Sequence, residues 1–65
     1  MTQKEQKEYV LNYVQDWAGS KQAALKWYEF EVIPALNKTA QQAVEANDFE
    51  SVKIYLEHIN EGGFA

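Results

Sequence analysis

Hydrophobic residues in the first part of the chain recur every three or four positions, which is the spacing of one face of an α-helix. The residues on this stripe are Val10, Tyr13, Val14 and Trp17, with Leu11 and Ala18 beside them. The pattern predicts a helix from about Gln3 to Ala18. Gly19 stands where a helix commonly ends in a left-handed residue, and Ser20 is a good N-cap for the next helix.

The second segment is apolar on more than one side and predicts a helix from Lys21 to about Phe30 or Glu31. Its apolar residues are Ala23, Ala24, Leu25, Trp27, Tyr28 and Phe30. A helix with so little polar surface is either central in a core or in contact with another protein.

Pro34 ends this helix, because the residue before a proline avoids helical backbone angles. We therefore interpret Ile33 to Asn37 as an extended apolar connector. Ile33 and Leu36 are expected to fill the core, and Asn37 is a residue that accepts a positive φ.

Two N-cap signals divide the last third of the chain into two further helices. Thr39 and Gln42 stand three residues apart, which is the spacing of a capping box, and they predict a third helix that ends near Ala46 and Asn47. Asp48 is expected to cap the fourth helix.

The fourth helix has the clearest periodicity in the chain. Its stripe consists of Val52, Tyr55, Leu56 and Ile59, at positions i, i+3, i+4 and i+7. Phe49 precedes this stripe, and Gly62-Gly63 is expected to end the helix.

The pattern as a whole predicts an all-α fold, a compact bundle of about four short helices. No useful length of chain alternates apolar and polar residues, so strands are not expected. With 65 residues, the chain is expected to form a single domain, residues 1–65.

Composition narrows the choice of partners. Six basic residues face ten acidic ones, which gives a net charge of −4, and every basic residue is a lysine. Without arginine, recognition of nucleic acid by this chain alone is disfavoured, although the first four lysines along the chain leave a modest basic patch open.

The chain contains no cysteine, so it has neither a disulfide framework nor a thiolate metal site. No segment has the length and hydropathy of a signal peptide or a membrane span, which leads us to expect a cytoplasmic protein.

The sequence offers little that favours catalysis. His58 is the single histidine; it lies off the fourth stripe, three residues before Glu61, and is expected to be a solvated side chain. Glu29 and Glu31 are two residues apart and point in different directions on a helix. We therefore predict no enzyme activity, no catalytic residue, no metal site and no cofactor.

Nine aromatic residues are many for so small a core. Some of Tyr9, Tyr28, Phe30 and Phe64 are expected to remain exposed, and Tyr28 and Phe30 are our candidates for partner contact. Exposed aromatic side chains are common anchors of protein interfaces, so a binding module or a homodimer is expected.

The chain closes with an aromatic residue behind two glycines: Gly62, Gly63, Phe64 and Ala65. Phe64 either folds back onto the fourth helix, as apolar residues after a glycine cap often do, or enters a pocket of a partner.

Three motifs occur in a fixed order: Ala24-Leu25-Lys26-Trp27, then Pro34-Ala35-Leu36 with Thr39, and finally a C-terminal set. That set is Leu56, Ile59, Gly62, Phe64 and Ala65. Together they resemble the toxin-binding domain of the Xre/MbcA/ParS antitoxins over about residues 18–65. Asn37-Lys38 replaces the family's usual glycine pair, and Ala40 replaces its proline.

The resemblance implies an antitoxin-like module whose partner is a RES-type toxin, an enzyme that consumes NAD or transfers ADP-ribose. It assigns Gly62, Gly63, Phe64 and Ala65 to a tail that enters the active-site cleft of the toxin. The helix-turn-helix that usually precedes this domain is not matched here, so DNA binding is not carried over. A homo-oligomeric scaffold or small regulator with no toxin partner remains the alternative.

Overall fold

In the computed structural model, which describes residues 1–59, the first helix α1 (Gln3–Ala18) has the predicted bounds. Thr2 and Glu5 form a capping box at its start, in which each side chain accepts a hydrogen bond from the backbone N–H of the other. Gly19 ends the helix with a φ of 97°, and its N–H donates to the carbonyl of Gln15. The left-handed glycine cap is therefore confirmed.

The second helix, α2 (Lys21–Phe30), also starts and ends where the sequence predicts. The Ser20 hydroxyl accepts from the N–H of Ala23 at 3.1 Å, which confirms the N-cap. The helix ends at Phe30. Glu31 is already extended, three residues before Pro34.

The expectation that the chain contains no strands is wrong for one short segment. Strands β1 (Val32–Ile33) and β2 (Lys38–Thr39) pair in an antiparallel hairpin, with Val32 opposite Thr39. Two residues are too few to show a period-two pattern. The turn closes through hydrogen bonds from the N–H groups of Leu36 and Asn37 to the carbonyl of Ile33, and Asn37 has the expected positive φ of 57°.

The third helix, α3 (Ala40–Glu45), begins at the predicted capping box. The Thr39 hydroxyl accepts from the N–H of Gln42 at 3.1 Å, and the Gln42 side-chain oxygen accepts from the N–H of Thr39 at 3.0 Å. Both atoms of the predicted pair are therefore in place.

The fourth helix, α4 (Phe49–His58), is not capped by the Asp48 side chain as expected. Asp48 has φ −116° and ψ 37°, outside the extended region from which a side chain reaches back to the first turn. Its carboxylate instead accepts from the Ser51 hydroxyl at 2.7 Å. The Gly62-Gly63 stop lies outside the described residues.

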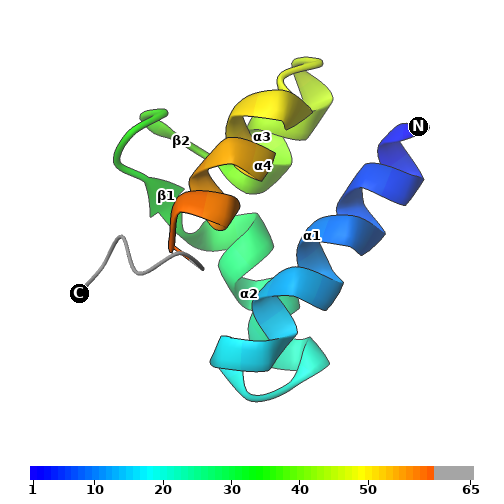
Figure 1. Ribbon diagram of the computed structural model, residues 1–65, viewed down its shortest axis with the longest axis vertical. Helices are drawn as coiled ribbons and strands as arrows, with labels where there is room; N and C mark the ends of the chain where they lie inside the picture. The colour runs from blue at the N-terminus through cyan, green and yellow to red at the C-terminus, as the bar shows by residue number, and fades with distance from the viewer. Residues whose placement is uncertain (60–65) are drawn as a thin grey trace.

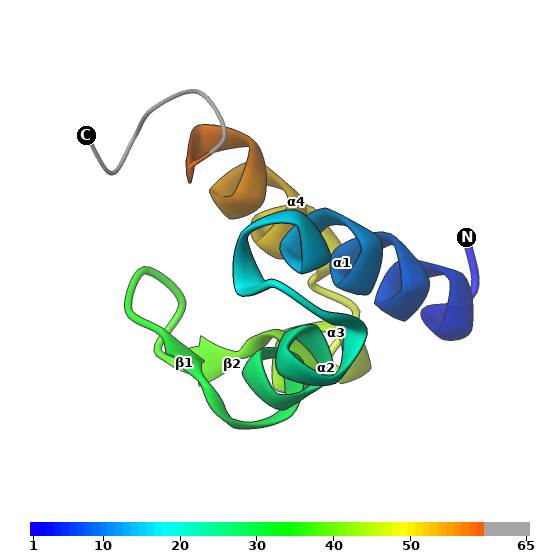
Figure 2. The same ribbon diagram turned by 90° about the horizontal axis from the view of Figure 1, so that it is seen from below.

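The elements form two layers (Figures 1 and 2). Helices α1 and α4 lie side by side in one layer, and α2, α3 and the hairpin form the other. Residues 1–59 thus form an all-α fold of four helices with one small hairpin, which confirms the predicted fold class.

The core between the layers is built mainly from aliphatic side chains. Its largest fully buried residues are Val10, Val14, Ile33, Val44, Val52 and Leu56. Ile33 is buried in the core, as expected, and Leu36 packs against the core while remaining partly exposed.

Trp17 is the exception on the α1 stripe. Its side chain is 48% exposed, although its helical phase matches that of Val10 and Val14. It lies in the last turn of α1, where its ring packs edge-to-face against Trp27 at 5.6 Å between centroids. The rest of the ring remains at the surface. Within residues 1–59, no helix has the length and hydropathy to cross a membrane.

Candidate functional site

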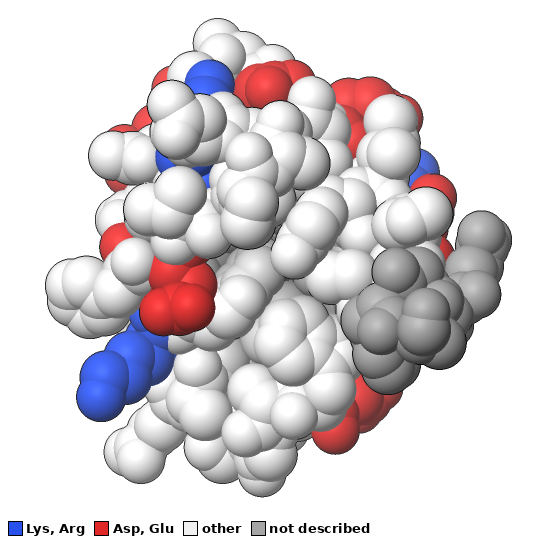
Figure 3. Space-filling view, turned by 90° about the vertical axis from the view of Figure 1, so that its left-hand side faces the viewer, with Lys and Arg blue, Asp and Glu red and all other residues white. Residues whose placement is uncertain are grey.

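Several large apolar side chains remain at the surface. Phe30 is 70% exposed, Ile54 58% and Val32 55%. Figure 3 shows the side of the molecule that carries the hairpin and the last turn of α4; charged side chains lie mainly at its margins, and its centre is uncharged and hollowed. Exposed apolar surface with a polar rim is typical of a protein-binding face.

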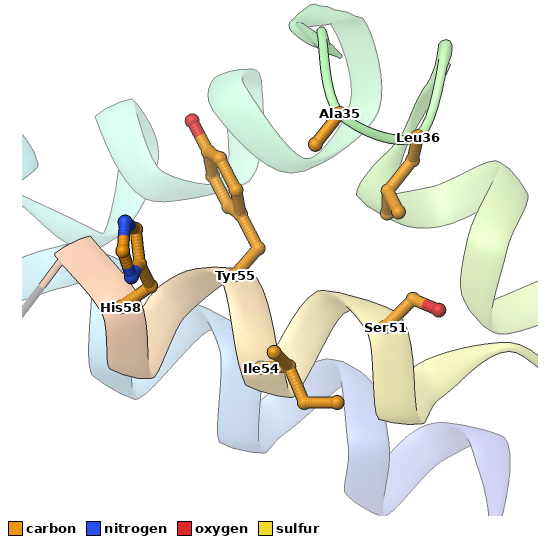
Figure 4. A pocket seen from close by; sticks show the side chains of 6 residues that line it. All are labelled: Ala35, Leu36, Ser51, Ile54, Tyr55 and His58. Carbon is orange, nitrogen blue, oxygen red and sulfur yellow. The ribbon is translucent and has the colours of Figure 1, made fainter. Parts of the chain in front are cut away.

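One hollow on the surface lies between the hairpin turn and α4, and we call it the hairpin–α4 hollow. Its volume is about 330 Å³, and it is lined by Ala35, Leu36, Ser51, Ile54, Tyr55 and His58. Figure 4 shows Ala35 and Leu36 on the turn, across from the four residues of α4. The spacing of those four residues brings them onto one side of the helix.

The hairpin–α4 hollow offers few polar groups to a ligand. The hydroxyl of Ser51 already donates to Asp48, and His58 stands at the end of the helix with an exposed side chain. The remaining lining is hydrocarbon apart from the phenol of Tyr55. This arrangement is suited to an apolar side chain rather than to a charged substrate.

A second hollow lies between the last turn of α1 and α2, and we call it the tryptophan hollow. It measures about 360 Å³ and is lined by Trp17, Ala18, Ala23, Lys26, Trp27, Phe30 and Glu31. Aromatic rings form much of its wall, and its charged residues are Lys26 and Glu31. It shares no residue with the hairpin–α4 hollow.

A third hollow, of about 310 Å³, is polar and lies where α1, α2 and α3 meet. The Lys7 ammonium lies 5.7 Å from the centre of the Tyr28 ring, and the Gln3 amide donates to the carbonyl of Val44 at 3.2 Å. Burial, followed by the charges of Glu45 and Glu29, raises the pKa of Tyr28. These groups stabilise the packing of three helices.

Tyr28 was expected to be an exposed contact residue, and that prediction is wrong. Its side chain is only 2% exposed, because α3 and the start of α1 cover this side of α2. Phe30, two residues along, points to the other side of α2 and is exposed as predicted. Tyr9 is half-buried against Phe49, with ring centres 5.4 Å apart.

The remaining predicted contact residues, Gly62, Gly63, Phe64 and Ala65, lie outside the described residues. Sequence reasoning did not single out Val32 or Ile54, which the structure exposes. A signal for Ile54 was present, since it is a large apolar residue off the Val52, Tyr55, Leu56 and Ile59 stripe.

His58 is exposed, as its position off the stripe predicted, and Glu31 is exposed beside a half-buried Glu29. Among the residues that the structure describes, no three His, Asp or Glu side chains gather as ligands for a metal ion.

The described residues of the three motifs mostly belong to the frame of the fold. Leu25, Trp27 and Leu36 pack against the core, Thr39 caps α3, and Leu56 is fully buried.

Comparison with family models, with curated proteins and with solved structures found no match.

Proposed function

We propose that this chain is an antitoxin-like protein-binding domain. Its C-terminal tail, residues 62–65, enters the active-site cleft of a RES-type toxin and blocks access to the nucleotide substrate. The chain itself performs no chemistry, needs no cofactor, binds no nucleic acid by itself and acts in the cytoplasm, where the toxin consumes NAD.

The observation that carries this proposal is the surface at the end of α4, the helix that precedes the tail in the sequence. Helix α4 ends at His58, beside a hollowed apolar face, and Ile59 is followed directly by the segment that contains Phe64. An apolar surface at the end of α4 is suited to contact the partner whose cleft receives the tail.

The positions of the motif residues support the same assignment. Trp27 and Leu36 pack against the core, the first from α2 and the second from the hairpin turn. The resemblance assigns both residues to the structural frame more than to partner contact, and their packing agrees with that role.

The test first looks for a RES-type toxin gene in the reading frames beside the gene for this chain and then uses the toxin that it encodes. Purified toxin is mixed with the full chain or with a chain that ends at Glu61, and NAD consumption is measured. The full chain is expected to suppress NAD loss, and the shortened chain is expected to leave it unaffected while retaining its helical circular dichroism spectrum.

Three results would contradict the proposal: the absence of such a toxin gene, inhibition that survives loss of the tail, or loss of helical structure in the shortened chain. The last of these would mean that Phe64 belongs to the domain's own core.

A second candidate function, self-association as a homo-oligomeric scaffold or regulator, is favoured by the tryptophan hollow. Lys26 and Glu31 both line it, so two copies related by a twofold axis are able to pair the lysine of one with the glutamate of the other. Phe30, 70% exposed, would supply the apolar contact.

Sedimentation equilibrium tests this second candidate. The full chain is expected to associate, and Phe30→Ser is expected to be monomeric; Ile54→Ser, at a residue of similar exposure in the other hollow, should associate like the parent. A monomeric parent at millimolar concentration removes the scaffold hypothesis and leaves the antitoxin-like one standing.

A further inference from the structure

The hairpin–α4 hollow has a lining that calls for one kind of occupant. Four of its six residues are hydrocarbon or aromatic, and Ser51 has already committed its hydroxyl to Asp48. Ile54, an aliphatic side chain in this lining, is more than half exposed. An aliphatic or aromatic side chain satisfies this lining, whereas a charged group would find few partners beyond the exposed imidazole of His58 and the phenol of Tyr55.

The hollow lies at the end of α4, so its distance from a cleft that receives the tail is limited by the length of chain between them. His58 both lines the hollow and is the last residue of α4. Between Ile59 and Gly62 there are three Cα-to-Cα steps, which span at most about 11 Å even when fully extended. Any cleft that encloses residues 62–65 must therefore bring its rim close to the end of α4.

We propose that the hairpin–α4 hollow is a socket for an apolar side chain on the rim of the same cleft that receives the tail. This inference rests on the proposed function and adds a second contact to it. The tail blocks the cleft, and the socket fixes the orientation of the domain on the rim.

The tail and the socket are expected to contribute differently to binding and to inhibition. A tail peptide without the domain loses conformational entropy when binding orders it, whereas a tail attached to a docked domain is held at high local concentration near the cleft. Loss of the socket should thus weaken affinity without removing inhibition at saturation. Loss of the tail should remove inhibition but leave weak binding.

The experiment titrates purified RES-type toxin with the full chain by calorimetry and follows NAD consumption in parallel. Ile54→Asp places a charge at the edge of the socket and is expected to raise the Kd at least tenfold, while inhibition remains complete at saturating concentration. Asn12→Asp introduces the same charge at an exposed position of α1 that does not line the hollow, and it should alter the Kd less than twofold.

Folding of the variants is checked by circular dichroism and urea denaturation. If Ile54→Asp is destabilised, the smaller change Ile54→Ala replaces it, with an expected rise in Kd of about fivefold. A Kd equal to that of the parent in a folded Ile54 variant overturns the socket and leaves the proposed function intact. Failure of the shortened chain to relieve inhibition overturns the proposed function itself.

Two other occupants are distinguished with the free chain. If removal of residues 62–65 shifts the methyl resonances of Leu36 and Ile54 in the absence of toxin, the tail itself fills the hollow. If Ile54→Asp abolishes self-association of the parent chain, a second copy fills it. Either result overturns the socket for a toxin side chain.

Discussion

The aliphatic residues of helix α4 differ sharply in burial. Val52 and Leu56 are fully buried between the layers, whereas Ile54, between them in sequence, is 58% exposed at the edge of a hollow. The inward residues follow the helical repeat and hold the fold together. The outward residue breaks the repeat, and it is this kind of departure that points to a binding surface.

The largest expected effect contrasts these two sides directly. Leu56→Ala leaves a cavity between α4 and the opposite layer and should reduce the free energy of unfolding by about 2–5 kcal/mol, enough to unfold much of so small a domain. Ile54→Ala should change it by less than about 0.5 kcal/mol. Urea denaturation followed by circular dichroism measures both. Equal losses would mean that the outer side of α4 also belongs to the core.

The two capping boxes offer the next contrast, because their chemistry is the same and their surroundings differ. Thr39 is 7% exposed and caps α3 inside the fold, while Thr2 caps α1 at the exposed start of the chain. Thr39→Ala should reduce the unfolding free energy by about 1–2 kcal/mol, and Thr2→Ala by about 0.5 kcal/mol. The comparison fails if Thr2→Ala proves the more costly substitution in urea denaturation.

Gly19 tests whether an exposed position can be costly without burial. Nothing lies within 4 Å of a Cβ built at this residue, so the cost of Gly19→Ala comes only from the left-handed φ of 97°. A loss of about 1 kcal/mol is expected, and Gly19→Asn should lose less, since asparagine tolerates this conformation better. Thermal unfolding of both variants measures the difference. An alanine variant as stable as the parent would contradict the conclusion that the positive φ of Gly19 makes this substitution costly.

The smallest effect concerns Tyr28 and appears only in alkaline solution. Burial and two nearby glutamates raise its pKa from the usual value of 10.0, so the folded state holds the phenol proton more tightly than the unfolded chain does. This contribution to stability is fully present below the unfolded pKa and is lost as the pH rises through the folded pKa. Tyr28→Phe should therefore show a weaker fall of the urea midpoint above about pH 10. If the urea midpoints of the parent and of Tyr28→Phe depended on pH in the same way, this prediction would be refuted.

The ends of helices were predictable from sequence because their causes are local. Ser20, the capping pair of Thr39 with Gln42, and the left-handed residues Gly19 and Asn37 each act within a few positions of the chain. Four short helices with these bounds follow directly from such signals.

The surface could be predicted only in part, since exposure depends on distant packing. Tyr28 and Phe30 lie two positions apart in an almost wholly apolar helix, and only the placement of α3 and α1 buries the first and exposes the second. Asp48 likewise has a suitable side chain for a cap, but the turn after α3 holds its backbone in a different conformation. The hollow beside α4 arises from a hairpin too short to leave a periodic signal.

The edge-to-face pair of Trp17 and Trp27 contains both tryptophans of the chain and joins α1 to α2. Intrinsic fluorescence excited at the red edge of the protein absorption band therefore reports on one end of this helix pair alone. Loosening of that end would alter the emission while α3 and α4 remain folded. Tryptophan emission thus reports on the tryptophan hollow, whereas the circular dichroism of the backbone follows the fold as a whole.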